Sequence, residues 1–184
     1  PGNLDGLDAQ FDLVWNFNVV NRHPHPRELL EAMCRASKQY VLVVVPNRKN
    51  YAFSLHRLHH RVTSQAWDHG PVDLLTAAPY RQMLSAFGLQ IREVSFVDCP
   101  WWPDIVDFGT LVSDFFPFLQ GAARRLKPEN RLLWPADCLP YYEPEKFAPL
   151  HRQMRRLSYF ERCPVAFVKQ RFAHHVAILA KKGY

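Results

Sequence analysis

The chain has 184 residues, enough for one domain with a substantial core. Hydrophobic residues make up 48% of it and charged residues 22%, which is ordinary for a folded protein and argues against wholesale disorder. The formal net charge of +6 allows attraction to polyanions. The basic residues are nevertheless scattered in short pairs, so nucleic acid is not the expected partner.

Cysteine usage and hydropathy indicate the compartment. Cys34, Cys99, Cys138 and Cys163 form no Cys-x-x-Cys pair, which favours free thiols in a reducing cytoplasm over a disulfide framework. No apolar run approaches the roughly 20 residues needed to span a bilayer. The polar start at Pro1 lacks a methionine and the features of a signal peptide, so we expect it to have been cut from a longer sequence.

The first elements form a strand–helix–strand unit. Residues 11–15 are a short apolar run, which predicts a buried parallel strand. Residues 26–37 carry apolar side chains at helical spacing and begin with Pro26, whose missing N–H is harmless there. The valine-rich run 40–45 has no polar alternation and predicts a central parallel strand buried on both faces.

Two amphipathic helices and a strand follow. Residues 51–62 place Leu55, Leu58 and Val62 on one stripe. Residues 77–87 predict a second helix, preceded by a threonine suited to an N-cap and stopped by a glycine. Residues 89–97 alternate between apolar and polar and predict the next strand.

The remaining sequence predicts a helical insert and a final strand. Residues 104–170 contain helical patterns at 105–119 and 144–160, separated by a proline-punctuated loop, and 172–180 predict a strand. The order of the elements indicates a single domain with an open α/β sheet. The insert, 104–170, is expected to shape the substrate side.

Several of these segments resemble one family when taken in order. Phe11-Asp-Leu-Val-Trp-Asn16, Pro26-x-x-x-Leu30 and Tyr40-Val-Leu-Val-Val-Val-Pro46 resemble the fourth strand, fourth helix and fifth strand of class I S-adenosylmethionine (SAM)-dependent methyltransferases. Phe87-Gly88-Leu89 and the residues after it are similar to the late helix and sixth strand of that family, and His175–Lys182 to its last, antiparallel strand. The resemblance covers most of residues 1–100 and 172–182. It implies a partial Rossmann-like sheet built from the later strands, with flanking helices.

The family's glycine-rich motif, Glu/Asp-x-Gly-x-Gly-x-Gly, is absent from these residues. Only Gly2 and Gly6 precede Gly70, and the acidic residue that holds the cofactor ribose is missing too. We therefore expect the carboxyl-terminal part of a methyltransferase fold, with poor cofactor binding and no activity as an isolated chain. The strand at 11–15 would keep an uncovered edge, which favours self-association or pairing with a partner chain.

The resemblance implies two sets of cofactor contacts. Asn3 matches the residue whose side chain meets the adenine amino group, and Leu4 the neighbour whose amide faces the ring; a turn-forming role for Asn3 is the alternative. Asn16, Phe17 and Asn18 sit at the carboxyl end of a strand, where ligands of open α/β sheets bind, and match residues that touch the methionine part of SAM. A structural role for Asn16 is equally open.

Three residues are candidates for catalysis. His23 follows in the next loop and could act as a general base, unless it is simply an exposed loop histidine. Asp68 and His69 lie between Trp67 and Gly70 in a loop that could cover the acceptor, the alternative being a structural loop with Trp67 packed inward.

Three further histidines fall on one predicted helix. His56, His59 and His60 have the i, i+3, i+4 spacing that is compatible with a metal site. No carboxylate or cysteine follows at ligand spacing, so no metal is expected.

The function implied by the resemblance is SAM-dependent methyl transfer to a small or lipid-like acceptor. An activated sulfonium donor needs mainly proximity and alignment, which explains why no nucleophile or phosphate-binding motif is found. Two alternatives stay open. One is an inactive half-domain that serves as a binding or assembly subunit, and the other is an RNA-modifying methyltransferase, suggested only by the charge.

Overall fold

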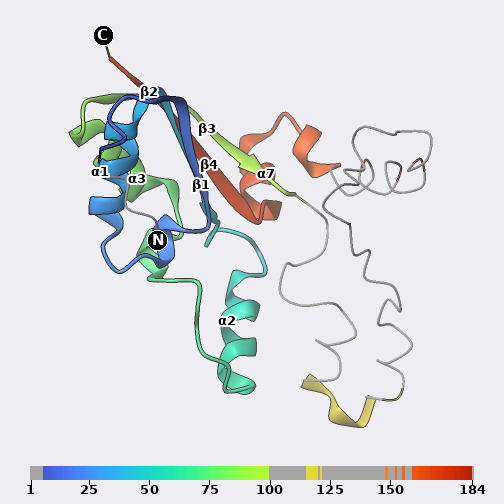
Figure 1. The fold of residues 1–184 in the computed structure, drawn as a ribbon. Coiled ribbons are helices and arrows are strands. Elements are labelled where there is room, and N and C mark those ends of the chain that lie inside the picture. Colours follow the sequence, from blue (N-terminus) through green and yellow to red (C-terminus); the bar gives the residue numbers. More distant parts are fainter. Residues whose placement is uncertain are drawn as a thin grey trace.

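The computed structural model of the chain describes residues 6–99, 115–119, 121, 148, 152, 155 and 159–183. Its strands form one open sheet (Figure 1): β1 Phe11–Phe17, β2 Ser37–Pro46, β3 Leu89–Val97 and β4 His175–Lys182. The helices described in it are α1 Pro26–Ala36, α2 Phe53–Val62, α3 Ala77–Ala86 and α7 Ala166–Phe172. Short 3-10 turns are η1 Val20–Arg22, η2 Val72–Leu74, η3 Pro117–Leu119 and η4 Phe160–Arg162.

The sheet has the strand order β1-β2-β4-β3. β1 is parallel to β2, whereas β4 is antiparallel to both β2 and β3. The predicted fold class is therefore confirmed: an open α/β sheet in which the last strand is antiparallel. The valine-rich strand is central, as predicted, because β2 lies between β1 and β4.

The last strand begins three residues later than predicted. Phe172 is instead the last residue of α7, and side chains from the loop after β2 stabilise the end of this helix. The Asn47 side-chain amide donates to the carbonyl oxygens of Gln170 (2.7 Å) and Ala173 (2.9 Å), and Asn50 donates to that of Phe172 (3.0 Å). The terminal carbonyls of a helix have no partner within it, so these amides supply the missing hydrogen bonds.

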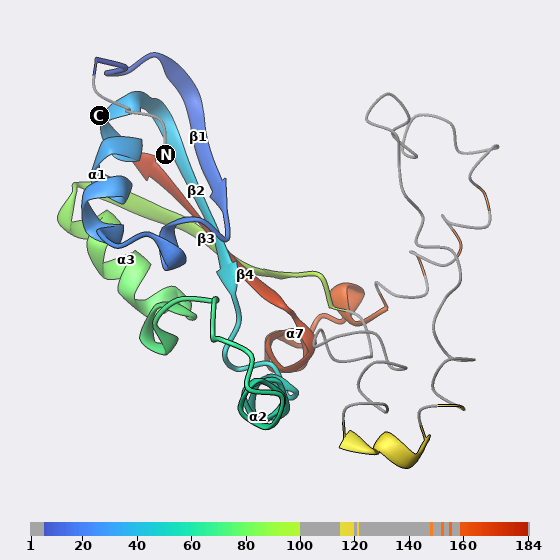
Figure 2. The same cartoon turned by 60° about the horizontal axis from the view of Figure 1, so that its bottom comes forward.

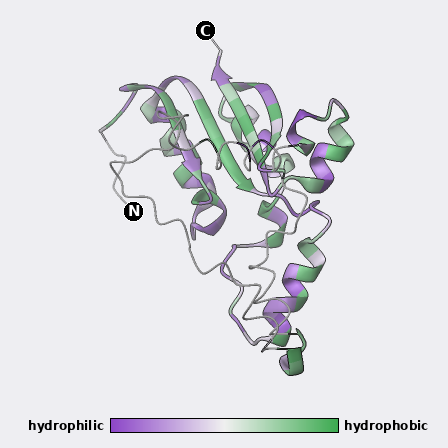
Figure 3. Cartoon of the chain, turned by 90° about the vertical axis from the view of Figure 1, so that its right-hand side faces the viewer, coloured by the Kyte–Doolittle hydropathy of each residue, from purple (hydrophilic) through white to green (hydrophobic). Residues whose placement is uncertain are grey.

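The hydrophobic core lies between the sheet and two helices. Figures 1 and 2 show α1 and α3 on the same side of the sheet, and Figure 3 shows the apolar character of the strands that they cover. The central members of the core are fully buried side chains from α1, β2, α3 and β4: Leu30, Val41, Val43, Val45, Tyr80, Leu84 and Ile178. This packing places the carboxyl ends of β1 and β2 side by side at one end of the sheet.

The prediction that β1 is a buried strand was wrong. Phe11, Leu13 and Trp15 are exposed, whereas Asn16 is buried and Val14 packs against the core. Successive side chains of a strand point to opposite faces. The odd-numbered residues of β1 therefore point away from α1, and within the described residues β1 is one of the two edge strands, the other being β3. Association through this edge stays a prediction.

The predicted apolar stripe of α2 is also exposed. Leu55, Leu58 and Val62 are accessible, whereas His59 is buried. Figures 1 and 2 show the reason, since α2 extends beyond the end of the sheet and does not cover one of its faces. Thr76 does occupy the N-cap position of α3, without a side-chain capping hydrogen bond.

Other predictions are met or fall outside the described residues. Asn3, Leu4 and most of the insert 104–170 are not among those residues. The cysteines that are described are free thiols, as predicted: Cys34, Cys99 and Cys163. In the same residues the structure has no helix with the length and apolar character to cross a membrane.

Candidate functional site

A cavity of about 280 Å³ opens at the end of the sheet where β1 and β2 finish and β4 begins. Its wall combines residues from this edge with residues from α2 and the loop that follows it. The lining residues are Phe17, Asn18, Arg22, Pro46, Asn47, Asn50, Ala52, Phe53, His56, Trp67, His69, Leu75, His174 and His175. In open α/β sheets, ligands bind outside the carboxyl ends of the strands, so this cavity is the candidate site.

Asn18 holds a special position at the end of β1. Its φ of +55° is in the left-handed region, which asparagine tolerates better than most residues. Its backbone N–H donates to the Val44 carbonyl (2.9 Å), and its side-chain nitrogen lies 3.0 Å from His175 Nε2. The side-chain oxygen is buried and has no hydrogen-bond partner among the described residues. Asn18 therefore lines the cavity and carries a buried acceptor that the described residues leave unused.

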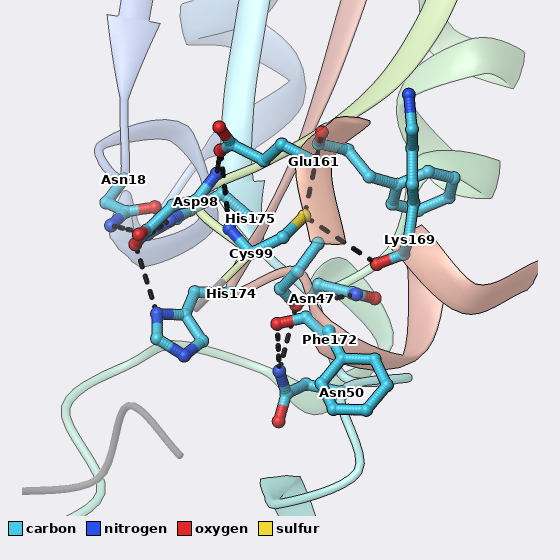
Figure 4. Close-up of polar contacts among 12 residues, drawn as sticks. Asn18, Asn47, Asn50, Asp98, Cys99, Glu161, Lys169, Phe172, His174 and His175 are labelled. Atoms are coloured by element: carbon cyan, nitrogen blue, oxygen red, sulfur yellow. Dashed lines mark hydrogen bonds and ion pairs between the residues drawn. The ribbon is translucent and has the colours of Figure 1, made fainter. Parts of the chain in front are cut away.

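An acid–histidine network lies beside Asn18 (Figure 4). Asp98 Oδ2 is 3.0 Å from His174 Nδ1 and 3.6 Å from His175 Nδ1. The hydrogen bond from His174, and then the nearby His175 ring, hold the pKa of the Asp98 carboxyl well below its usual value against the opposing effect of burial. His174 and His175 both line the cavity, so this network forms part of its sheet end.

Sequence reasoning missed this network. His174 is 76 residues from Asp98 in the sequence. The two meet because β3 and β4 are antiparallel and pair Val97 with His175. The adjacent histidines at the start of a predicted last strand were the available signal, together with an acidic residue directly after the strand beside it.

The predicted cofactor residues at the end of β1 separate into two groups. Phe17 and Asn18 line the cavity, and the Phe17 ring lies 4.7 Å from the His175 ring. Asn16 points the other way, since its side-chain nitrogen donates to Met33 Sδ (3.7 Å) and its oxygen accepts from the Val20 N–H (3.5 Å). These contacts favour the structural alternative for Asn16.

Only one of the predicted catalytic residues lines the cavity, and it is His69. Asp68 is exposed but sits beside His69, with Oδ1 3.4 Å from His69 Nε2 and Oδ2 3.8 Å from Arg22. His23 is not part of the wall, and its Nδ1 accepts from the His25 N–H (3.1 Å). The structure thus brings His69 and Asp68 together and leaves His23 apart.

The loop that carries His69 is closed by an internal hydrogen bond and docked against Asn21. Trp67 Nε1 donates to the Gly70 carbonyl (2.7 Å), and the buried Asn21 side chain donates to the His69 carbonyl (2.9 Å). Gly70 has a φ of +81°, and a Cβ at this position would lie 1.8 Å from the Asn21 carbonyl oxygen. Only glycine allows this close approach, so Gly70 determines the position of the loop and of His69 within it.

No protein-family model matches the sequence, and no curated protein matches it either. Among solved structures, a candidate methyltransferase from Bacillus halodurans C-125 is similar over 100% of this chain and 70% of its own, with 11% identity and a TM-score of 0.44. A SAM-dependent methyltransferase from Archaeoglobus fulgidus is similar over 97% of this chain and 63% of its own, with 15% identity and a TM-score of 0.44. Both similarities concern the fold. The chain spans only part of each of these proteins.

Proposed function

We propose that the chain forms the carboxyl-terminal part of a domain that transfers a methyl group from SAM to a small or lipid-like acceptor. The supporting observation is the cavity at the carboxyl ends of β1 and β2, where an open α/β sheet binds its ligand. Its volume of about 280 Å³ is near the lower end of the roughly 300–1,000 Å³ typical of small-molecule sites.

The residues of the wall fit the methionine part of SAM. Asn18 lines the cavity, and a rotation of its side chain would present its buried oxygen, which has no hydrogen-bond partner in the described part of the chain, as an acceptor for an amino group. The half-exposed ring of Phe17 offers an apolar surface and a π face, both suited to a sulfonium. When bound, SAM supplies an activated methyl group, and the chain's own task is to orient the reactants and exclude water.

The acceptor is assigned to the end of the cavity near α2. His56 of α2 lines it there, together with Trp67 and His69 of the loop that is predicted to cover the acceptor. His69 is the predicted catalytic residue that can touch an acceptor. Asp68 acts through its contact with His69, as a positioning residue.

Binding of S-adenosylhomocysteine tests the proposal, with two aromatic residues of β1 as a matched pair. Phe17 and Trp15 point to the same face of the strand and are 48% and 62% exposed, but only Phe17 lines the cavity. In the product of the complete reading frame, calorimetry should show binding that Phe17→Ala weakens at least tenfold and Trp15→Ala leaves within twofold.

The isolated 184-residue chain should bind weakly, because the glycine-rich loop is not among its residues. Absence of binding by the complete product would overturn the proposal and favour the half-domain alternative, a binding or assembly subunit. Equal losses for Phe17→Ala and Trp15→Ala would show that the cavity is not the site.

A further inference from the structure

Three histidines come together at the α2 end of the cavity. His56 and His60 lie one turn apart on α2, and their Nε2 atoms are 3.0 Å from each other. The His69 ring from the following loop lies 4.8 Å from the His56 ring and 5.5 Å from the His60 ring, measured between centroids. One nitrogen from each of the three rings lies within 4.8 Å of the other two.

This group differs from the triplet considered in the sequence analysis. His59 is buried on another side of α2, where its ring lies 5.9 Å from that of Phe115. The loop supplies His69 in its place. No metal was expected because no carboxylate or cysteine follows at ligand spacing in the sequence, but folding brings a loop histidine to that place instead.

Two of the three rings are oriented by contacts outside the group. His60 Nδ1 lies 3.1 Å from the Ala66 carbonyl and donates to it, which leaves the Nε2 lone pair facing His56. Histidines that bind metals use their second nitrogen in this manner. His69 is positioned by the docked loop, through the hydrogen bond from Asn21 to its carbonyl (2.9 Å) and the close approach at Gly70.

The surroundings of the group are apolar on one side and charged on the other. The Trp67 ring lies 5.7, 5.3 and 4.8 Å from the rings of His56, His60 and His69. Arg22 contacts His69 Nδ1 (3.4 Å), and Asp68 faces His69 Nε2 (3.4 Å). Because the Arg22 side chain is partly exposed, it can move into solvent when a cation arrives, and the Asp68 carboxylate offsets the added charge.

We propose that His56, His60 and His69 bind one divalent transition-metal ion, for which Zn²⁺ is the best-fitting choice. Three imidazoles are the donor set of several zinc sites, with Zn–N distances of about 2.0–2.1 Å that place tetrahedral ligand atoms roughly 3.3 Å apart. The separation of 3.0 Å between the Nε2 atoms of His56 and His60 is close to this value. Imidazole also suits other borderline ions, so Co²⁺ can serve as a spectroscopic probe.

The ion would face the candidate site, because His56 and His69 both line the cavity. The fourth position of a three-histidine site is open to water or a substrate oxygen, whose pKa a bound Zn²⁺ lowers. That the ion holds an acceptor hydroxyl or a water rests on the proposed methyl transfer. That the three histidines bind a metal ion does not rest on it, and metal binding is measured without SAM.

The test is calorimetry with Zn²⁺ on the metal-free chain, with Co²⁺ absorption as a second readout. We expect one ion per chain, and Co²⁺ bands of tetrahedral intensity. His60→Ala and His69→Ala should each weaken binding by at least about 100-fold, since loss of an outer-shell partner alone costs 10- to 100-fold. The matched control is His25→Ala, a loop histidine outside the cluster, which should stay within twofold.

Three outcomes would overturn the proposal. They are no stoichiometric binding by the unmodified chain, binding that His60→Ala leaves unchanged, and equal loss in His25→Ala. Circular dichroism checks that each variant folds. If His60→Ala does not fold, His69→Gln takes its place, and Zn²⁺ must then raise the melting temperature of the unmodified chain but not that of the variant.

Discussion

Replacing Gly70 with alanine should destabilise the chain much more than the same replacement at Gly88. Both glycines have positive φ, +81° and +80°. Alanine in this left-handed conformation costs about 1–2 kcal/mol at either position. Around Gly88, chain neighbours aside, no atom of the described residues lies within 4 Å of the added Cβ. At Gly70 the Cβ would lie 1.8 Å from the Asn21 carbonyl oxygen and 2.8 Å from its carbon, so the loop must move away.

Moving the loop breaks the hydrogen bond from the Asn21 side chain to the His69 carbonyl. Asn21 is fully buried, and a buried amide left without a partner costs about 1–3 kcal/mol. The sum for Gly70→Ala is therefore roughly 2–5 kcal/mol, against about 1–2 kcal/mol for Gly88→Ala. Urea denaturation followed by circular dichroism gives both values, provided that the slope of each transition is unchanged. Equal destabilisation of the two variants would refute the reasoning, because the docked loop would then contribute nothing.

Three other perturbations test separate parts of the structure. Tyr80→Phe should leave the free energy of unfolding unchanged or raise it by up to about 1 kcal/mol, because the buried Tyr80 hydroxyl has no hydrogen-bond partner among the described residues; thermal melting measures this. Asp98→Asn should lower the free energy of unfolding by about 1 kcal/mol at pH 6, a small value because the carboxyl is 54% exposed. Since its pKa in the folded chain is well below the usual value of about 3.9, that difference is fully present above pH 4 and declines as the pH falls toward the lowered pKa, so urea midpoints should differ less at pH 3 than at pH 6. Burial raises the pKa of Cys34 to about 11 and that of Cys99 to about 12, so both should react with iodoacetamide at pH 8 far more slowly than the less buried Cys163, as peptide mass spectrometry can show.

The sequence predicted the elements better than their surroundings. Four valines and a leucine in the run 40–45 are enough to predict a central strand, because no polar residue alternates with them to mark a solvent-facing side. The run 11–15 has a similar composition, yet Trp15 is exposed, since composition does not reveal which face of a strand a helix covers. The same holds for α2, whose apolar stripe resembles a core face but lies beyond the sheet.

The candidate site was predicted only where its residues are close in sequence. Phe17 and Asn18 follow a predicted parallel strand, so their place at the ligand edge comes from topology alone. Asp98 meets His174 only through the register of β3 on β4, and His69 joins His56 only through the docking of a loop. Both contacts depend on packing between segments that no local pattern relates.

The site as a whole predicts that its two ends can be disabled separately. Phe17 and Asn18 lie at the end of β1, whereas His60 lies on α2 and contacts lining residues such as His56 and Trp67 without lining the cavity itself. If the sheet end holds the cofactor and the α2 end holds the ion, Phe17→Ala should weaken S-adenosylhomocysteine binding at least tenfold and leave Zn²⁺ affinity within twofold. His60→Ala should weaken Zn²⁺ binding and leave S-adenosylhomocysteine binding within twofold. Calorimetry of both ligands on both variants tests whether the two ends are independent. Sites without shared partners respond independently. A folded variant that loses both ligands would therefore show that the two ends form one site.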